Sequence, residues 1–494
     1  MSCFIGIDLG TQSVKVVMYD EAGHLLSWAQ RDYPISTPQI GYAEQEPEEW
    51  WKLTFSALQE VIHQTSEREI KALSFSGQMH GLVMVDKNCK PVCPAIIWAD
   101  QRSEKEVIQI REKFGPRLAT IAGSDIATGF MAASLLWVKK NYPELYDKIA
   151  KVMLPKDYLK IKLGLSPSSD VADAASSLLF DINQRSWSEE IIKELDFKPS
   201  LFPSIYESAQ IIGQVSPSVQ KELGITGDAL VIAGAGDQHC AALGNGIINE
   251  GEVLITIGTG GQVFTPILQP IVDAQLRIHT FCHAVPQTWH WLGASLCAGL
   301  SLSWFKKSVL DNNHYTFDYP TLDEEAVRVT PGSNGLVFLP YLIGERTPHR
   351  DSLARGAFIN LHLTHQRGDL ARAIMEGVSM ALKDSVSIFE ELGINAKKFI
   401  FAGGGAKSFL WRSILSSFIE QPLQTTKVKE EAATGAAILA MVGSGQFRSF
   451  HEAVQQIIRY DSPVDPQEQW IPIYRERYQT YRSLYPALKP FFPK

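Results

Sequence analysis

An aspartate and a glycine-threonine turn open the chain. Asp8 follows the apolar run 4–7 and precedes a turn that contains Gly10 and Thr11. A carboxylate beside such a turn suits Mg²⁺, which keeps several waters and needs only one or two carboxylates besides phosphate oxygens. The turn's N–H groups and the Thr11 hydroxyl could face phosphate, and Lys15 could add a positive charge. A plain hairpin turn with a solvated aspartate explains the same residues equally well.

Two more glycine-rich turns occur in the second half. Residues 258–261 read GTGG, and three glycines in four residues permit close approach of the backbone to a ligand. Residues 403–408 read GGGAKS between the apolar run 400–402 and a predicted helix through Trp411. A strand, a glycine loop and a helix N-terminus make an anion or nucleotide site.

The loop at 403–408 matches neither of two familiar phosphate motifs. A Walker A loop needs glycine at 401 and 406, where Phe401 and Ala406 stand, and a Rossmann fingerprint needs Gly or Ala at 408, where Ser408 stands. We therefore favour a nucleotide loop of another kind over a simple helix–sheet crossing.

A second strand-end aspartate is Asp237. It follows the buried-strand pattern 229–236, ALVIAGAG, and precedes Gln238. This is a place for the general base that would take a proton from a hydroxyl group. An aspartate there could also merely cap the next helix.

Polar and aromatic residues gather in two loops of the first half. Gln78, Met79 and His80 lie in SGQMHG, and Trp98 and Asp100 follow the predicted strand at 95–97. Such groups suit a polyol, because a ring packs on C–H surface while polar groups bind hydroxyls. A lone His80 would more often be structural, but the cluster favours a ligand site.

The elements that must position these residues repeat along the chain. Strand-turn-strand patterns at 4–19 and 252–266 place Gly10 and Gly258 248 positions apart, almost half of the 494 residues. A third strand is expected at 24–33, and a helix at 46–63 with Pro47 in its first turn. We predict two similar α/β domains, 1–245 and 246–494, with a cleft between them and a C-terminal tail that could pack back on the first.

The small-residue segment 432–441, AATGAAILAM, is expected to form a helix. Small side chains let helices approach closely, which is useful where two domains meet. A buried core helix is an equally good interpretation of the segment alone.

Composition excludes several classes of protein. The net charge of −8 argues against a nucleic-acid binder, which needs a basic face. The N-terminus has no cationic start before its apolar run, so we expect no secretory signal. The six cysteines lack disulfide or zinc spacing, and free thiols in a cytoplasmic protein are the preferred interpretation.

Ten segments in order resemble the FGGY carbohydrate kinases of the actin/hexokinase superfamily, most of all the members that phosphorylate xylulose. They are FIGIDLGTQSVK (4–15), EQEPEEWW (44–51), SGQMHG (76–81), AIIWADQR (95–102), LPKDYL (154–159), AGAGDQ (233–238), IGTGG (257–261), LPYLIGERTPH (339–349), FAGGGAKS (401–408) and ATGAAILA (433–440). Each is unspecific alone, but the ordered set is specific for the family. SGQMHG and ERTPH are the segments that point to xylulose.

The resemblance implies two actin/hexokinase-like (ribonuclease H-like) domains and phosphorylation of D-xylulose at its terminal hydroxyl with ATP and Mg²⁺. Asp237 is then the catalytic base and Asp8 the Mg²⁺/phosphate aspartate. The expected sugar-binding residues are Gln78, Met79, His80, Trp98, Asp100, Asp237 and Gln238. The expected nucleotide- and phosphate-binding residues are Gly10, Thr11, Lys15, Thr259, Gly260, Gly404, Gly405 and Lys407. Gln238 and the GTGG turn depart from the Asn and GTSG that are frequent among relatives.

Three alternatives stay open. The chain could phosphorylate ribulose, another ketose or glycerol. It could be a chaperone- or filament-like ATPase switch, although little sequence follows the last nucleotide segment. It could be a sugar-binding regulator without catalysis, although both Asp8 and Asp237 are present. The expected partners are a small sugar and ATP, with no nucleic acid and no membrane, and the sequence allows a homodimer.

Overall fold

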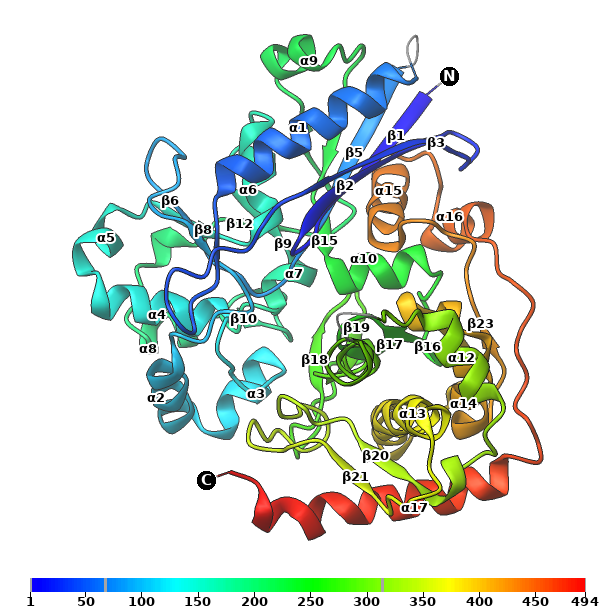
Figure 1. Ribbon diagram of the computed structural model, residues 1–494. Helices are drawn as coiled ribbons and strands as arrows, with labels where there is room; N and C mark the ends of the chain where they lie inside the picture. Colours follow the sequence, from blue (N-terminus) through cyan, green and yellow to red (C-terminus); the bar gives the residue numbers. More distant parts are fainter. Residues whose placement is uncertain (1, 66–68, 312–314, 494) are drawn as a thin grey trace.

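The first half of the chain is built on a sheet with strand order β13-β14-β5-β1-β2-β3 (Figure 1). The computed structural model describes residues 2–65, 69–311 and 315–493. Strands β1, β2 and β3 form an antiparallel meander, and β5 runs parallel to β1. The strands of this sheet are β1 (Ser2–Leu9), β2 (Ser13–Asp20), β3 (Leu25–Asp32), β5 (Glu69–Gly77), β13 (Ile211–Gln214), β14 (Leu230–Ile232) and β15 (Ala235–Gly236), which also pairs with β5.

The second half repeats this arrangement in a sheet of order β18-β19-β17-β16-β22-β23. Strand β16 has an antiparallel neighbour, β17, and a parallel neighbour, β22, just as β1 has β2 and β5. The predicted repeat of two α/β units is therefore confirmed. The strands are β16 (Glu252–Ile257), β17 (Gly261–Ile267), β18 (His279–Cys282), β19 (Trp289–Ser295), β22 (Lys398–Ala402) and β23 (Leu423–Gln424).

Helices cover both sheets. They are α1 (Pro47–His63), α2 (Glu104–Phe114), α3 (Pro116–Ala122), α4 (Met131–Asn141), α5 (Pro143–Lys148), α6 (Pro155–Lys162), α7 (Val171–Ala175), α8 (Glu189–Glu194), α9 (Pro217–Leu223), α10 (Asp237–Gly244), α11 (Gly299–Trp304), α12 (Tyr319–Val327), α13 (Arg367–Glu391), α14 (Phe409–Ile419), α15 (Glu431–Gly443), α16 (Phe450–Ile457) and α17 (Ile471–Leu488). Short strands complete the fold: β4 (Glu44–Gln45), β6 (Val83–Val85), β7 (Ala95–Ile96), β8 (Lys151–Met153), β9 (Ser168–Asp170), β10 (Phe180–Asp181), β11 (Ser186–Trp187), β12 (Ser204–Tyr206), β20 (Val337–Leu339) and β21 (Ala357–Ile359).

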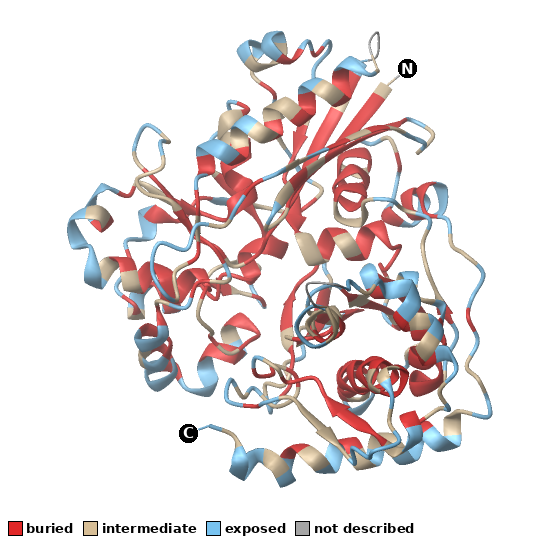
Figure 2. Cartoon of the chain, viewed as in Figure 1, coloured by how far each residue is buried: buried red, intermediate tan, exposed pale blue. Residues whose placement is uncertain are grey.

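The central strands β1, β2 and β5 of the first sheet are buried on both faces (Figure 2). Alternate β1 residues point to opposite faces. Ile5 and Ile7 join a core with α1, whereas Phe4 joins a core with α15. The predicted helix at 46–63 is confirmed as α1, with Pro47 as its first residue.

The predicted strand at 229–236 is interrupted. Gly234 has φ 90°, and a Cβ there would lie 2.5 Å from the Phe75 carbonyl oxygen. The segment therefore forms two short strands, β14 and β15, separated at this glycine.

The two halves meet where α10 crosses α15 (Figure 1). A Cβ on Gly435 would lie 1.8 Å from the Cys240 carbonyl oxygen, and one on Gly244 would lie 1.9 Å from the Glu431 carbonyl oxygen. The small-residue helix thus allows the close crossing expected between domains.

The last helix does not return to the first half. Helix α17 packs on α13, α14 and β20, all of the second half. The expectation that the C-terminal tail could pack back on the first domain is wrong for this helix. It is α15 that packs against β1 and β5.

Candidate active site

Asp8 and Asp237 lie at the same edge of the first sheet. Asp8 pairs with Ser76 of β5, and on the other side of β5 Gly236 pairs with Gly77, directly before Asp237. Two inter-strand spacings separate the aspartate backbones, about 10 Å. Segments 229 residues apart in the sequence thus bring two carboxylates to one edge.

The charges of these aspartates act on each other. Burial, together with the nearby charges of Asp8 and Asp173, raises the pKa of Asp237 to about 8. Burial also raises the pKa of Asp8, although its hydrogen bond from Ser76 and the charge of Lys15 oppose the shift. A cation bound nearby would lower both pKa values again, because an opposite charge favours the ionised form of a carboxyl group.

The Asp8 carboxylate has room for a hydrated cation. Its Oδ1 accepts a hydrogen bond from Ser76 Oγ at 2.6 Å, and its Oδ2 has no hydrogen-bond partner among the described residues. No group of three or more His, Cys, Asp and Glu side chains in metal-binding geometry occurs in the described part of the chain. One or two carboxylates completed by water and phosphate oxygens are the donor set that Mg²⁺ uses.

Lys15 links the two halves beside Asp8. It lies opposite Asp8 on β2, and its Nζ is 2.7 Å from Glu430 Oε2. Asp8, Lys15, Gly404 and Lys407 all line a cavity of about 640 Å³ between the two halves. The predicted phosphate residues of both halves therefore share one space.

A second cavity, of about 730 Å³, adjoins the first along the glycine loop. It combines apolar and aromatic walls with glycine backbone, as a nucleotide base requires. Its lining includes Thr259, Gly404, Gly405 and Lys407 of the predicted set, together with Leu300, Leu302, Tyr319, Asp323 and Trp411.

The loop at 403–408 is both a helix–sheet crossing and a cavity wall. A Cβ on Gly403 would lie 2.6 Å from the Ile257 carbonyl oxygen, so this residue must be glycine to cross β16. Gly404 is exposed and lines both cavities. Ser408 caps α14 by accepting a hydrogen bond from the Trp411 N–H, which explains why serine stands there.

The GTGG turn is fixed to the start of α11. The Thr259 carbonyl accepts hydrogen bonds from the N–H groups of Ala298 and Leu300. A Cβ on Gly260 would lie 2.8 Å from the Ser295 carbonyl oxygen. The turn thus presents its remaining surface to the 730 Å³ cavity, where Thr259 lines the wall.

The loop Gln78–His80 lies beside Asp237. A Cβ on Gly236 would come within 2.7 Å of Met79 Cγ. Gln78 is buried, donates from Nε2 to Gln45 Oε1 at 2.9 Å, and leaves its Oε1 without a partner among the described residues. Both the backbone and the side chain of Gln238 hydrogen-bond the Asp237 carboxylate, which lowers the pKa of Asp237 against the larger effect of burial.

In the second loop predicted to bind sugar, Trp98 and Asp100 have different surroundings. Trp98 is 40% exposed and donates from Nε1 to Thr11 Oγ1 at 2.9 Å. Asp100 is fully buried and accepts hydrogen bonds from the Ala43 N–H and from Arg102. Its carboxylate therefore holds the loop that carries Trp98, and the substrate-binding role of Asp100 stays a prediction.

Comparison with known proteins decides what this site belongs to. Residues 3–244 match the N-terminal domain of the FGGY family of carbohydrate kinases, and residues 253–444 match its C-terminal domain. The chain belongs to the FGGY family. Its two-domain fold is the actin/hexokinase-like fold expected from the sequence.

The relatives of this FGGY kinase cover it end to end. The xylulose kinase of Bacillus subtilis is 35% identical over 491 residues, which are 99% of this chain and 98% of that one. The crystal structure of a xyloylose kinase from Brucella ovis superposes with a TM-score of 0.93 at 31% identity, covering 99% of this chain and 100% of that one. A gluconate kinase from Lactobacillus acidophilus gives a TM-score of 0.93 at 25% identity, covering 99% and 98%.

The FGGY kinase also brings an arginine from its second half toward the Gln78–His80 loop. Both sequence neighbours of Arg346 are held by hydrogen bonds. Glu345 accepts one from the Ser295 hydroxyl, and Thr347 Oγ1 accepts one from the Ala294 N–H. The Arg346 guanidinium makes no hydrogen bond or ion pair within the described chain. Its charge adds to burial in lowering the pKa of His80 to about 3. The sequence pattern ERTPH marked this segment but gave no role to its arginine.

An aromatic cluster, also missed from the sequence, packs against His80 of the Gln78–His80 loop. The His80 ring stacks on Phe130 with centroids 4.0 Å apart, and Phe130 lies 6.3 Å from His279 of the second half. His279 Nδ1 is 2.5 Å from Ser124 Oγ. These contacts between distant segments leave no local pattern in the sequence.

Proposed function

We propose that this FGGY kinase transfers the γ-phosphoryl group of ATP to the terminal hydroxyl of D-xylulose, giving D-xylulose 5-phosphate. The observation that carries the proposal is the shared edge of Asp8 and Asp237, with the Gln78–His80 loop beside Asp237 and the inter-half cavity beside Asp8. Full-length similarity to xylulose kinases supports the choice of sugar.

Asp237 accepts the proton of the attacking hydroxyl. A carboxylate is a far weaker base than an alkoxide, so the proton moves late, after the bond to phosphorus has begun to form. In a loose phosphoryl-transfer transition state, positioning and charge stabilisation carry most of the catalysis. Hydrogen bonding by Gln238 lowers the pKa of Asp237 and so favours the ionised form that acts as the base.

ATP occupies the two adjoining cavities in this proposal, with its base in the 730 Å³ cavity and its phosphates toward Asp8. Thr11, Thr259, Gly260, Gly404 and Lys407 surround the phosphates. When bound, Mg²⁺ supplies the positive charge that offsets the phosphate oxygens. The Asp8 carboxylate, with its free Oδ2, fits the role of holding that hydrated ion.

The proposal extends to the setting of the reaction. The six cysteines are all free, which fits a reducing compartment such as the cytoplasm. No helix of the described chain is both long and apolar enough to span a bilayer. The domain boundary at 245/246 and the homodimer that the sequence allows stay predictions.

An ADP-release assay over a panel of sugars tests the function. We expect D-xylulose to give the highest kcat/KM among xylulose, ribulose, gluconate and glycerol. A higher value for another sugar reassigns the substrate within the family. ATP turnover that no sugar stimulates would instead favour an ATPase switch.

A further inference from the structure

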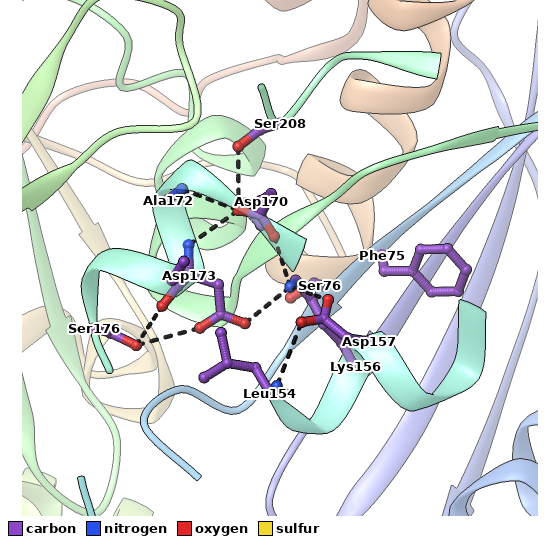
Figure 3. A network of polar contacts seen from close by, with 12 residues as sticks. Phe75, Ser76, Leu154, Lys156, Asp157, Asp170, Ala172, Asp173, Ser176 and Ser208 are labelled. Atoms are coloured by element: carbon purple, nitrogen blue, oxygen red, sulfur yellow. Dashed lines mark hydrogen bonds and ion pairs between the residues drawn. The ribbon is translucent and has the colours of Figure 1, made fainter. Parts of the chain in front are cut away.

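A buried ion network is centred on Lys156 (Figure 3). It adjoins the strand end before the Gln78–His80 loop, because a Cβ on Gly77 would lie 2.6 Å from Lys156 Cβ. Lys156 Nζ is 2.8 Å from Asp157 Oδ1, 2.6 Å from Asp170 Oδ2 and 3.0 Å from Asp173 Oδ2. All four side chains are fully buried. Buried charges of this kind are stable only when paired, so the network fixes α6, the end of β9 and α7 relative to one another.

The network reaches the end of α7 through Asp173. Ser176, which follows α7, donates from Oγ to the Asp173 carbonyl at 2.7 Å. The same Oγ lies 3.3 Å from Asp173 Oδ1 (Figure 3). Ser176 is itself fully buried, and both acceptors near its hydroxyl belong to Asp173.

Ser176 makes two hydrogen bonds to His80. The His80 N–H donates to Ser176 Oγ at 3.2 Å, and His80 Nδ1 lies 2.8 Å from the Ser176 carbonyl oxygen. A carbonyl only accepts, so Nδ1 must carry the proton and Nε2 must be the acceptor of the ring. The main-chain carbonyl of Ser176 thus selects the His80 tautomer, whereas its side-chain Oγ holds the His80 main-chain N–H.

His80 needs this support because its backbone is strained. Its φ is 70°, a region that non-glycine residues keep only where surrounding contacts hold them. Phe130 stacks on the ring at 4.0 Å, which fixes its plane. His80 Nε2 has no hydrogen-bond partner among the described residues.

We infer that Ser176, anchored through Asp173 to the Lys156 network, is a positioning residue that holds His80 in its strained conformation, with Nε2 as an acceptor for a sugar hydroxyl. This rests on the proposed role of His80 in sugar binding. Ser176 does not touch the sugar and acts only through His80. The buried network therefore serves sugar affinity and has no part in nucleotide binding.

Ser176→Ala tests the inference, with Ser177→Ala as its matched control. Ser177 is equally buried and makes a similar bond, to the Ala174 carbonyl at 2.6 Å, but none to His80. Ser176→Ala should raise the KM for the preferred sugar about tenfold, the effect of losing one well-placed hydrogen bond. The KM for ATP and the sugar-free ATPase rate should stay within about twofold, as both should for Ser177→Ala.

A double-mutant cycle separates positioning from general damage. In a His80→Ala background, Ser176→Ala should have no further effect on the sugar KM, because the imidazole that would contact the sugar is gone even though the main-chain N–H still bonds Ser176 Oγ. Ser176→Cys, which keeps the size but weakens the hydrogen bond, should give a smaller increase and serves if the alanine variant does not fold.

Three results would overturn the inference. The first is that Ser176→Ala and Ser177→Ala have the same KM for the sugar. The second is that Ser176→Ala raises the sugar KM as much in the His80→Ala background as in the wild type. The third is that Ser176→Ala raises the KM for ATP as much as the KM for the sugar. Each leaves the proposed function standing, because the wild-type protein still phosphorylates its sugar. A wild-type protein that phosphorylates no sugar contradicts the proposed function itself and removes the basis of the inference.

Discussion

Lys15 Nζ of the first half lies 2.7 Å from Glu430 Oε2 of the second. The pair stands beside Asp8, in the cavity proposed for the phosphates. A bound triphosphate would compete with Glu430 for the ammonium group, so Lys15 would couple the arrival of phosphate to the contact between the halves.

Lys15→Met should lower kcat/KM for ATP about tenfold, the scale of one lost charge-assisted contact to phosphate. The sugar KM should change little, because Lys15 lies on the nucleotide side of Asp8. Steady-state kinetics with each substrate varied in turn measures both. Lys52→Met, on the exposed face of α1, is the control. Equal effects of Lys15→Met on the two substrates would contradict this assignment.

The raised pKa of Asp237 has a consequence for stability. A carboxyl group whose pKa is about 8 in the folded protein and ordinary in the unfolded chain destabilises the fold as pH rises between those values. Asp237→Asn removes this ionisation. Without ligands, the melting temperature of the variant should therefore exceed that of the wild type by a margin that grows from pH 4 to about 8 and then levels off.

Differential scanning fluorimetry of both proteins across this range gives the comparison. A margin independent of pH would show that Asp237 has an ordinary pKa. Asp8→Asn provides a second check, because losing the charge of Asp8 lowers the pKa of Asp237 and should shift the levelling-off to lower pH.

Arg346 is expected to contact the sugar from the second half. Its guanidinium has no partner in the described chain, and its charge lowers the pKa of both His80 and His279 further than burial does alone. Arg346→Met should raise the sugar KM about tenfold and leave the ATP KM unchanged. Arg355→Met, which loses only bonds to nearby carbonyls, should affect neither. An unchanged sugar KM in Arg346→Met would exclude the contact.

The crossing of α10 and α15 should tolerate no added atom. The Cβ of Gly435→Ala would overlap the Cys240 carbonyl oxygen at 1.8 Å, and we expect a loss of about 3 kcal/mol or more in unfolding free energy. Gly445→Ala, just beyond α15, meets no atom within 4 Å and bears only the strain of its positive φ, about 1 kcal/mol. Urea unfolding compares the two, and equal losses would contradict the close crossing.

Local patterns in the sequence predicted the elements that carry Asp8, the GTGG turn and the glycine loop. Each is a strand followed by a turn, and apolar periodicity together with glycine reveals such units without tertiary information. Asp8 and Asp237 were both recognised at strand ends, and the fold brings them together because parallel strands align their carboxyl ends at one edge of a sheet.

Other roles depend on contacts between distant segments. The structural role of Asp100 could not be predicted, because its hydrogen bond from the Ala43 N–H, 57 residues earlier, leaves no sequence signal. Lys156 lies in the segment LPKDYL, but nothing in the sequence gives it a role, because only the fold brings Asp170 and Asp173 against it. The path of α17 was mispredicted for the same reason, since its aromatic face could have packed on either half.

The most direct test of the account is the turnover of Asp237→Asn with saturating ATP and the preferred sugar. Removal of a positioned general base should lower kcat by about 10³-fold, within the usual range for such groups. Sugar binding, followed by tryptophan fluorescence, should persist. A kcat within a few-fold of the wild type in a folded, sugar-binding variant would contradict the role of Asp237 and the mechanism built on it.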